Sequence, residues 1–106
     1  MKPICMVRKS DGAVVARAAR PEQVLEQDGN CYFHPHTVNR DLLEISDRMH
    51  DCPHKGRRYW VDLKDGKLYT HDVAWVYPDP KPEYRDIAGW FGFYPEHRSY
   101  RKTECA

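Results

Sequence analysis

A short stretch in the middle of the chain gathers the side chains best suited to chemistry. Residues 47–58 combine carboxylates, histidines, a cysteine, a lysine and arginines. Such a set can bind an anion, transfer a proton or pair with itself. Pro53 restricts its own backbone and that of Cys52, and Gly56 can adopt a positive φ, so we expect a stiff loop that presents Lys55. The candidate ligand contacts in this loop are Asp47, His50, Cys52, Lys55 and Arg57.

Two of these side chains are also candidates for catalysis. A neighbouring Lys55 or histidinium would lower the pKa of the Cys52 thiol and raise the fraction of nucleophilic thiolate. Asp47 is the second candidate, as the carboxylate of a small hydrolase or transferase. Structural roles compete with both, because a cysteine before proline is commonly a small buried residue, and Ser46 with Asp47 can close a turn through backbone N–H groups. The whole segment also fits a solvated, self-paired turn.

The tryptophans Trp60, Trp75 and Trp90 recur at intervals of fifteen residues. If each lies on a neighbouring strand, the three rings gather on one side of a sheet. One interpretation is a hydrophobic core, because Trp and Tyr supply large buried areas in a small β domain. The other is an open aromatic pocket, with Tyr77 among its residues, that stacks a planar or cationic ligand while the cations of residues 55–58 bind its anionic edge.

The four cysteines and six histidines form no recognisable zinc motif. No Cys-x-x-Cys pair occurs, so a four-cysteine site lacks paired ligands. His50, Cys52 and His54 alternate and would share one face of an extended strand, but Pro53 makes a regular strand there unfavourable. A Gly-rich strand-to-helix motif for dinucleotides is also absent. We therefore expect no metal and no cofactor.

Short strands joined by tight turns must position these residues. Asp11-Gly12 and Asp65-Gly66 are hairpin signals, since both central turn positions favour positive φ. Residues 21–27 begin with proline and end at Asp28-Gly29-Asn30, which predicts a helix of at most about two turns. The fold class expected is mainly β, a single-domain assembly of short antiparallel strands with one or two short helices. The predicted strands cover residues 4–8, 13–18, 30–33, 57–63, 68–77 and 90–94.

Length and termini indicate one domain. A chain of 106 residues has room for a single modest core, so we assign residues 1–106 to one domain. The alternating prolines of residues 78–82 predict a stiff, extended connector. Residues 97–106 are mostly polar and predict a flexible tail.

Composition and charge exclude several classes of protein. Hydrophobic residues make up 41% and aromatic residues 12% of the chain, more than a disordered chain carries. A formal net charge of +1 gives no global attraction to nucleic acid or to an anionic membrane. No apolar stretch has membrane-spanning length, and the N-terminus lacks an apolar leader. We expect a cytoplasmic protein with reduced thiols, present as a monomer or weak homodimer.

Four motifs resemble one known family, the domain of unknown function 427 family. They are residues 46–56 (SDRMHDCPHKG), 72–80 (DVAWVYPDP), 87–89 (IAG) and 93–95 (FYP), and the resemblance covers nearly the whole chain. It implies a small β architecture related to the β-tent domains, a group that includes zinc-ribbon proteins and aromatic-cage ligand binders. This chain departs from the family pattern at Met49 and His50, which replace hydroxyl residues, at His54, and at Trp90-Phe91-Gly92.

The family has no settled activity, although it has been labelled nucleotidyltransferase-like. Such enzymes need a phosphate loop on a helix and two or three carboxylates for Mg²⁺, and neither pattern is present in this sequence. The residues favour a domain that binds a small planar or anionic ligand through residues 47–58 and nearby aromatic rings. The alternatives are a small hydrolase or transferase that uses Cys52 or Asp47, and a protein-interaction module.

Overall fold

The computed structural model describes residues 2–105, and tight turns divide this part of the chain into nine strands. The strands are β1 (Ile4–Arg8), β2 (Val14–Ala18), β3 (Val24–Gln27), β4 (Asn30–Phe33), β5 (Leu43–Cys52), β6 (Gly56–Asp65), β7 (Leu68–Val76), β8 (Phe91–Phe93) and β9 (Tyr100–Glu104). Three short 3-10 helices connect some of them: η1 (Pro21–Gln23), η2 (Pro35–Thr37) and η3 (Pro82–Ile87).

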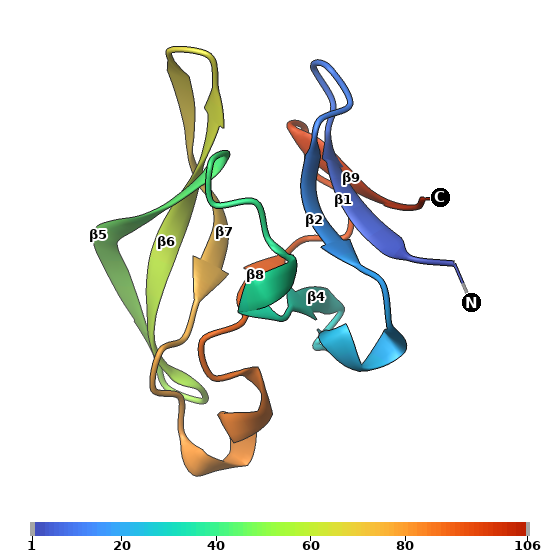
Figure 1. The fold of residues 1–106 in the computed structure, drawn as a ribbon. Helices are drawn as coiled ribbons and strands as arrows, with labels where there is room; N and C mark the ends of the chain where they lie inside the picture. Colours follow the sequence, from blue (N-terminus) through green and yellow to red (C-terminus); the bar gives the residue numbers. More distant parts are fainter. Residues whose placement is uncertain (1, 106) are drawn as a thin grey trace.

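The strands form two antiparallel sheets, which confirms the mainly β fold. One sheet has the order β2-β1-β9 and the other the order β3-β4-β8-β7-β6-β5. Figure 1 shows β1, β2 and β9 as one wing of the molecule and β5, β6 and β7 as the other, with β4 and β8 between them. Within residues 2–105, no helix has the length and apolar character needed to cross a bilayer.

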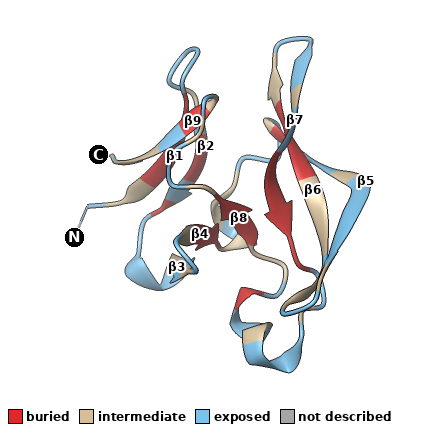
Figure 2. Ribbon diagram, turned by 180° about the vertical axis from the view of Figure 1, so that it is seen from behind, coloured by how far each residue is buried: buried red, intermediate tan, exposed pale blue. Residues whose placement is uncertain are grey.

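The main core lies between the two sheets, where the buried segments of both face each other (Figure 2). Met6 and Val15 come from the small sheet, and Phe33 and Phe93 from the large one, and all four are fully buried. Each such side chain contributes roughly 1.5–3 kcal/mol through burial. Tyr100 on β9 joins the sheets, because its hydroxyl donates to the Val73 carbonyl on β7 (2.6 Å).

The C-terminal segment, for which the sequence predicted a flexible tail, contains a strand. Residues 100–104 form β9 and pair with β1 along its whole length. The strand has one large apolar residue, Tyr100, which is fully buried. Its other residues are polar, so the sequence shows no apolar alternation from which a strand could be predicted.

The prediction of reduced thiols is wrong for one pair of cysteines. Cys5 and Cys105 form a disulfide with their Cα atoms 6.0 Å apart. The β1–β9 register places Cys5 opposite Thr103, two residues before Cys105. A separation of 100 residues hid this proximity in the sequence. Cys31 and Cys52 are free.

Two segments have a different secondary structure from the one predicted: residues 21–27, predicted as a helix, and residues 47–56, predicted as a loop. Asp28 (φ 54°) and Gly29 (φ 79°) form a hairpin turn between β3 and β4, so residues 24–27 are a strand and only η1 is helical. The predicted loop over residues 47–56 is mostly strand, because β5 continues to Cys52 and pairs with β6. Only the three residues 53–55 form the turn, and the proline lies just outside the strand.

Candidate functional site

The β5–β6 hairpin ends beside a cavity of about 570 Å³, which we call the tip pocket. The strand register pairs Asp51 with Arg57 and Met49 with Tyr59. Asp51, Arg57 and Tyr59 therefore point to the same face of the hairpin. The lining residues are Asp51, Cys52, Gly56, Arg57 and Tyr59 from the hairpin, with Pro78 and Asp79 from the connector after β7.

Contacts from two other segments fix the hairpin tip. The Lys81 backbone N–H donates to the Lys55 carbonyl (2.7 Å), and the Lys81 ammonium donates to the Pro53 carbonyl (2.6 Å). The Lys55 ammonium binds Asp28 in the β3–β4 turn (2.5 Å) and lies 4.9 Å from the centre of the Tyr84 ring. Because these contacts need no ligand, the tip pocket is formed in advance, which lowers the entropy lost on binding.

Cys52 has the surroundings of an ionisable thiol. Burial opposes ionisation, but the backbone N–H groups of Lys55 and His54, together with the Lys55 ammonium, lower the pKa of the Cys52 thiol overall. Burial instead raises the pKa of the other free thiol, Cys31. Cys52 is thus the more nucleophilic of the two at neutral pH, and it also lines the tip pocket.

Arg57 carries the positive charge of the tip pocket. Its Nε donates to Asp51 Oδ1 (2.8 Å), and this hydrogen bond lowers the pKa of the Asp51 carboxyl. Both side chains are more than half exposed, so the pair contributes little to stability. Separation of Arg57 from Asp51 would therefore cost little free energy.

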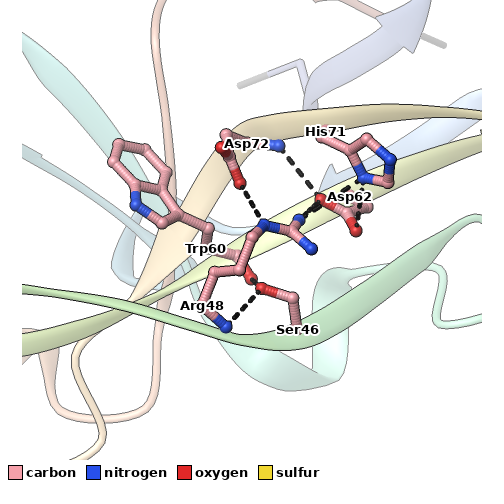
Figure 3. Close-up of polar contacts among 6 residues, drawn as sticks. All are labelled: Ser46, Arg48, Trp60, Asp62, His71 and Asp72. Atoms are coloured by element: carbon pink, nitrogen blue, oxygen red, sulfur yellow. Dashed lines mark hydrogen bonds and ion pairs between the residues drawn. The ribbon is translucent and has the colours of Figure 1, made fainter.

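A polar network that the sequence did not reveal lies on the other face of β6 (Figure 3). There β5 and β7 both depart from regular pairing, and Asp72 adopts a left-handed backbone (φ 60°) that few residues other than glycine favour. Asp62, which is almost fully buried, accepts hydrogen bonds from the Arg48 guanidinium and the Asp72 backbone N–H (3.0 Å). His71 Nδ1 lies 3.0 Å from Asp62 Oδ2.

This network keeps a carboxylate charged inside the protein. Burial opposes ionisation of Asp62, but Arg48, the Asp72 N–H and His71 together lower the pKa of its carboxyl. Arg48 Nε also donates to the Asp72 carboxylate (3.0 Å), so one guanidinium bridges β5, β6 and β7. None of these residues lines the tip pocket. We interpret the network as the brace that holds the irregular part of β5 on the sheet.

The predicted aromatic residues are all at least partly buried, and Trp60 and Trp90 pack against the core cluster that contains Trp75 and Tyr77. Trp75 and Tyr77 are buried, and Trp75 Nε1 donates to the Tyr32 hydroxyl (3.1 Å). Trp60 packs edge-on against Trp75, with ring centres 6.4 Å apart. The guanidinium carbon of Arg58 lies 4.2 Å from the Trp60 centre and 5.3 Å from the Trp75 centre. Arg58 thus occupies the place that a planar or cationic ligand would need on these rings.

The remaining candidates lie apart from the tip pocket. Asp47 and His50 are exposed on β5, and Trp90 packs against His34 with ring centres 5.2 Å apart. In the described part of the chain, no three His, Cys, Asp or Glu side chains are arranged to hold a metal ion. His50, Cys52 and His54 therefore do not form such a group.

Sequence reasoning selected Cys52 and Arg57 but missed most of the other lining residues. Pro78 and Asp79 reach the tip pocket only because the connector folds back onto the hairpin, through the contacts of Lys81. Tyr59 could have been found from the sequence, because it follows Arg57 by two residues on the strand predicted over residues 57–63 and so lies on the same face.

Fold and site together define a small two-sheet β domain with a preformed surface pocket. The family model described as "Domain of unknown function (DUF427)" matches residues 5–104, and the chain belongs to this family. A search of curated proteins found no match.

Proposed function

We propose that this domain binds a small planar molecule with an anionic group in the tip pocket. The observation that carries the proposal is a preformed cavity of about 570 Å³ that combines flat apolar surface with a cation. Typical small-molecule sites occupy about 300–1,000 Å³ and place a few polar groups on a largely apolar wall. Tyr59 and Pro78 supply the flat surface, and Arg57 supplies the cation.

The ion pair of Arg57 supports an anionic rather than a neutral ligand. An exposed pair such as Arg57–Asp51 contributes up to about 1 kcal/mol, so a carboxylate or phosphate can replace Asp51 with little penalty. Asp79, from the connector after β7, also lines the tip pocket and can accept a hydrogen bond from a ring N–H or an amino group. Planar heterocycles that carry both an anion and a donor therefore fit this lining best.

A ligand-observed NMR screen tests this proposal with nucleotides, sugar phosphates and heteroaromatic carboxylates as probes. Compounds that bind the wild type are then titrated into Arg57→Ala and into Lys67→Ala, an exposed-lysine control in the β6–β7 turn. We expect Arg57→Ala to weaken binding at least about tenfold and Lys67→Ala to leave it unchanged. Absence of any binder, or equal affinity for all three proteins, contradicts the proposal.

Nucleophilic catalysis by Cys52 is a second candidate, favoured by the lowered pKa of its thiol. In such a reaction the thiolate attacks the carbonyl carbon of a bound ester, and the alcohol leaves with a proton from water. Water then hydrolyses the thioester and restores the thiol. No observation in the structure favours Asp47 in this role, since it is exposed and lies outside the tip pocket.

Alkylation by iodoacetamide, followed by mass spectrometry, tests the reactivity of Cys52. We expect Cys52 to react faster than the buried Cys31 at neutral pH, with a rate that rises at lower pH than for an ordinary thiol. Turnover of p-nitrophenyl acetate that is lost in Cys52→Ser, while tip-pocket ligands still bind, supports catalysis. Equal turnover in the variant excludes Cys52 as the nucleophile.

A further inference from the structure

A second cavity, of about 330 Å³, lies between the two sheets, and we call it the inter-sheet cleft. Its walls come from the β1–β2 turn, the β6–β7 hairpin and the segment just before β9. Figures 1 and 2 both show the two hairpin ends at the same end of the molecule. The inter-sheet cleft and the tip pocket have no lining residue in common.

A buried arginine braces this cleft. Arg8 is only 8% exposed, and its Nε and Nη2 donate to the two carboxylate oxygens of Asp11 (3.0 and 2.6 Å). Its Nη1 donates to the Lys64 carbonyl on β6, so one side chain of the small sheet is anchored to the large sheet. The wall is therefore rigid before any ligand binds, as in the tip pocket.

Two more cations line the rim of the cleft. The Lys9 N–H donates to the Ser99 carbonyl (2.9 Å), which holds the β1–β2 turn against the segment that carries Arg98. The Lys9 ammonium pairs with Glu96, whereas none of the ion pairs within residues 2–105 involves the exposed Arg98. The neighbouring His97 has a lowered pKa. Burial of the imidazole is the main cause, and the positive charges of Arg98 and Lys9 lower the pKa further. Of the two rim cations, Arg98 is the one left without an ion pair within residues 2–105.

Neutral and acidic hydrogen-bonding groups complete the lining. The hydroxyl residues Ser10 and Ser99 lie at the cationic rim, and Thr70 lies on the β7 wall. Asp65, at the end of β6, has a half-exposed carboxylate 4.0 Å from Arg8 Nε. One part of the cleft thus presents cations and hydroxyl donors, and the other presents a carboxylate that accepts hydrogen bonds.

We infer that the inter-sheet cleft binds a phosphorylated sugar, with its phosphate between Lys9 and Arg98 and its hydroxyl groups toward Asp65 and Thr70. A phosphate suits the rim because its oxygens accept hydrogen bonds from guanidinium, ammonium and hydroxyl groups together. A carboxylate beside it accepts from sugar hydroxyls but repels a second anion, so a compound with one phosphate and several hydroxyls matches the lining. A cavity of about 330 Å³ has room for a pentose or hexose phosphate.

Titration with ribose 5-phosphate and with inorganic phosphate, followed by amide NMR at low ionic strength, tests this inference. We expect ribose 5-phosphate to shift the amide resonances of Ser10 and Ser99. Arg98→Glu should weaken its affinity at least about tenfold, because the charge reversal replaces attraction by repulsion. Arg85→Glu makes the same change at an exposed position on η3, outside the cleft, and should change affinity less than about twofold.

The sugar part of the inference depends on Asp65. Ribose 5-phosphate should bind more tightly than inorganic phosphate to the wild type, and Asp65→Asn should reduce that preference while retaining the binding of phosphate. Equal affinity for both probes, or equal weakening by Arg98→Glu and Arg85→Glu, overturns the inference. Arg98→Glu leaves the tip pocket intact, so ligands of the tip pocket should bind this variant as they bind the wild type.

Discussion

The tip pocket and the inter-sheet cleft are held in shape by different parts of the chain. At the tip pocket a backbone hydrogen bond joins Lys81 to Lys55, and Gly56 lies against the connector. At the inter-sheet cleft the guanidinium of Arg8 makes the cross-sheet bond. Backbone contacts survive most substitutions, whereas a side-chain contact is lost with one residue. The tip pocket should therefore tolerate loss of a charged side chain better than the inter-sheet cleft.

The largest effect is expected from Arg8→Met. This change removes the donor to the Lys64 carbonyl and the bidentate partner of Asp11 in a nearly buried setting. Hydrogen bonds to charged groups contribute about 1.5–3 kcal/mol each, and part of the loss is recovered by water, so the free energy of unfolding should fall by about 2–3 kcal/mol. Urea denaturation measures this change.

Arg57→Met is the matched control at the tip pocket. It also removes an arginine bonded to an aspartate, but both partners are exposed, so the loss should not exceed about 1 kcal/mol. Equal losses from Arg8→Met and Arg57→Met would show that the side chain of Arg8 does not brace the cleft.

Gly56→Ala should show that backbone geometry maintains the tip pocket. Gly56 has φ 109°, which side-chain-bearing residues rarely adopt, although an added Cβ would lie at an ordinary 3.6 Å from Asp79 O and Lys81 N. The cost therefore comes from backbone strain and should be about 1–2 kcal/mol in unfolding free energy. Relaxation of the strain would move the hairpin relative to the connector, so ligands of the tip pocket should bind more weakly.

Gly66→Ala provides the comparison for this strain. Gly66 also has a positive φ (63°) but lies in the open β6–β7 turn, where an added Cβ meets nothing within 4 Å. It should lose stability for the same reason while leaving the affinity for tip-pocket ligands unchanged. Unchanged tip-pocket affinity in Gly56→Ala would contradict the geometric role of Gly56.

Lys55→Ala should have a smaller effect on stability. Lys55 loses its ion pair with Asp28 and its contact with the Tyr84 ring, but Asp28 is well exposed and returns to water. An ion pair in which only the aspartate is exposed and a cation–π contact together contribute about 1 kcal/mol. The backbone bond from Lys81 to Lys55 remains, so the ligand affinity of the tip pocket should change less than about threefold. Loss of the folded state would show that Lys55 has a far larger structural role.

Local signals in the sequence predicted much of the fold. Hairpins do form at Asp11-Gly12 and Asp65-Gly66, but only the glycine of each pair has a positive φ, and Asp65 pairs with Leu68, so the β6–β7 turn residues are Gly66 and Lys67. The same dipeptide at Asp28-Gly29 was interpreted as the end of a helix, since Pro21 and good helix formers precede it. In residues 24–27, antiparallel pairing of β3 with β4 is more favourable than the helix that their intrinsic propensity suggests, because the pairing adds β3 to the sheet.

The parts that could not be predicted depend on contacts between distant segments. Cys52 and Arg57 were found because the short stretch of residues 47–58 contains both, whereas the bond of Arg8 to Lys64 and the Cys5–Cys105 disulfide depend on how distant strands pack. On β6, Asp62 lies between the buried Val61 and Leu63, and strand alternation points it away from the core. It is nevertheless buried, because irregular neighbouring strands place Arg48 and His71 over it.

The smallest effect expected is a change in acid sensitivity at the inter-sheet cleft. Hydrogen bonds from Arg8 and from the Ala13 backbone N–H lower the pKa of Asp11 to about 2 from its usual 3.8. Because the pKa is lower in the folded state, Asp11 stabilises the protein above about pH 4, and this contribution is lost as the pH falls toward about 2. In Asp11→Asn the unfolding free energy, measured by urea denaturation, should therefore decrease less between about pH 4 and about pH 2 than in the wild type.

Asp51→Asn is the control at the tip pocket. It should also reduce this pH dependence, because Arg57 lowers the pKa of Asp51. Only Asp11→Asn should change the amide resonances around Lys64. If the pH dependence of the unfolding free energy is the same in Asp11→Asn and in the wild type, other groups cause the acid destabilisation, and the Arg8–Asp11 pair does not contribute to it.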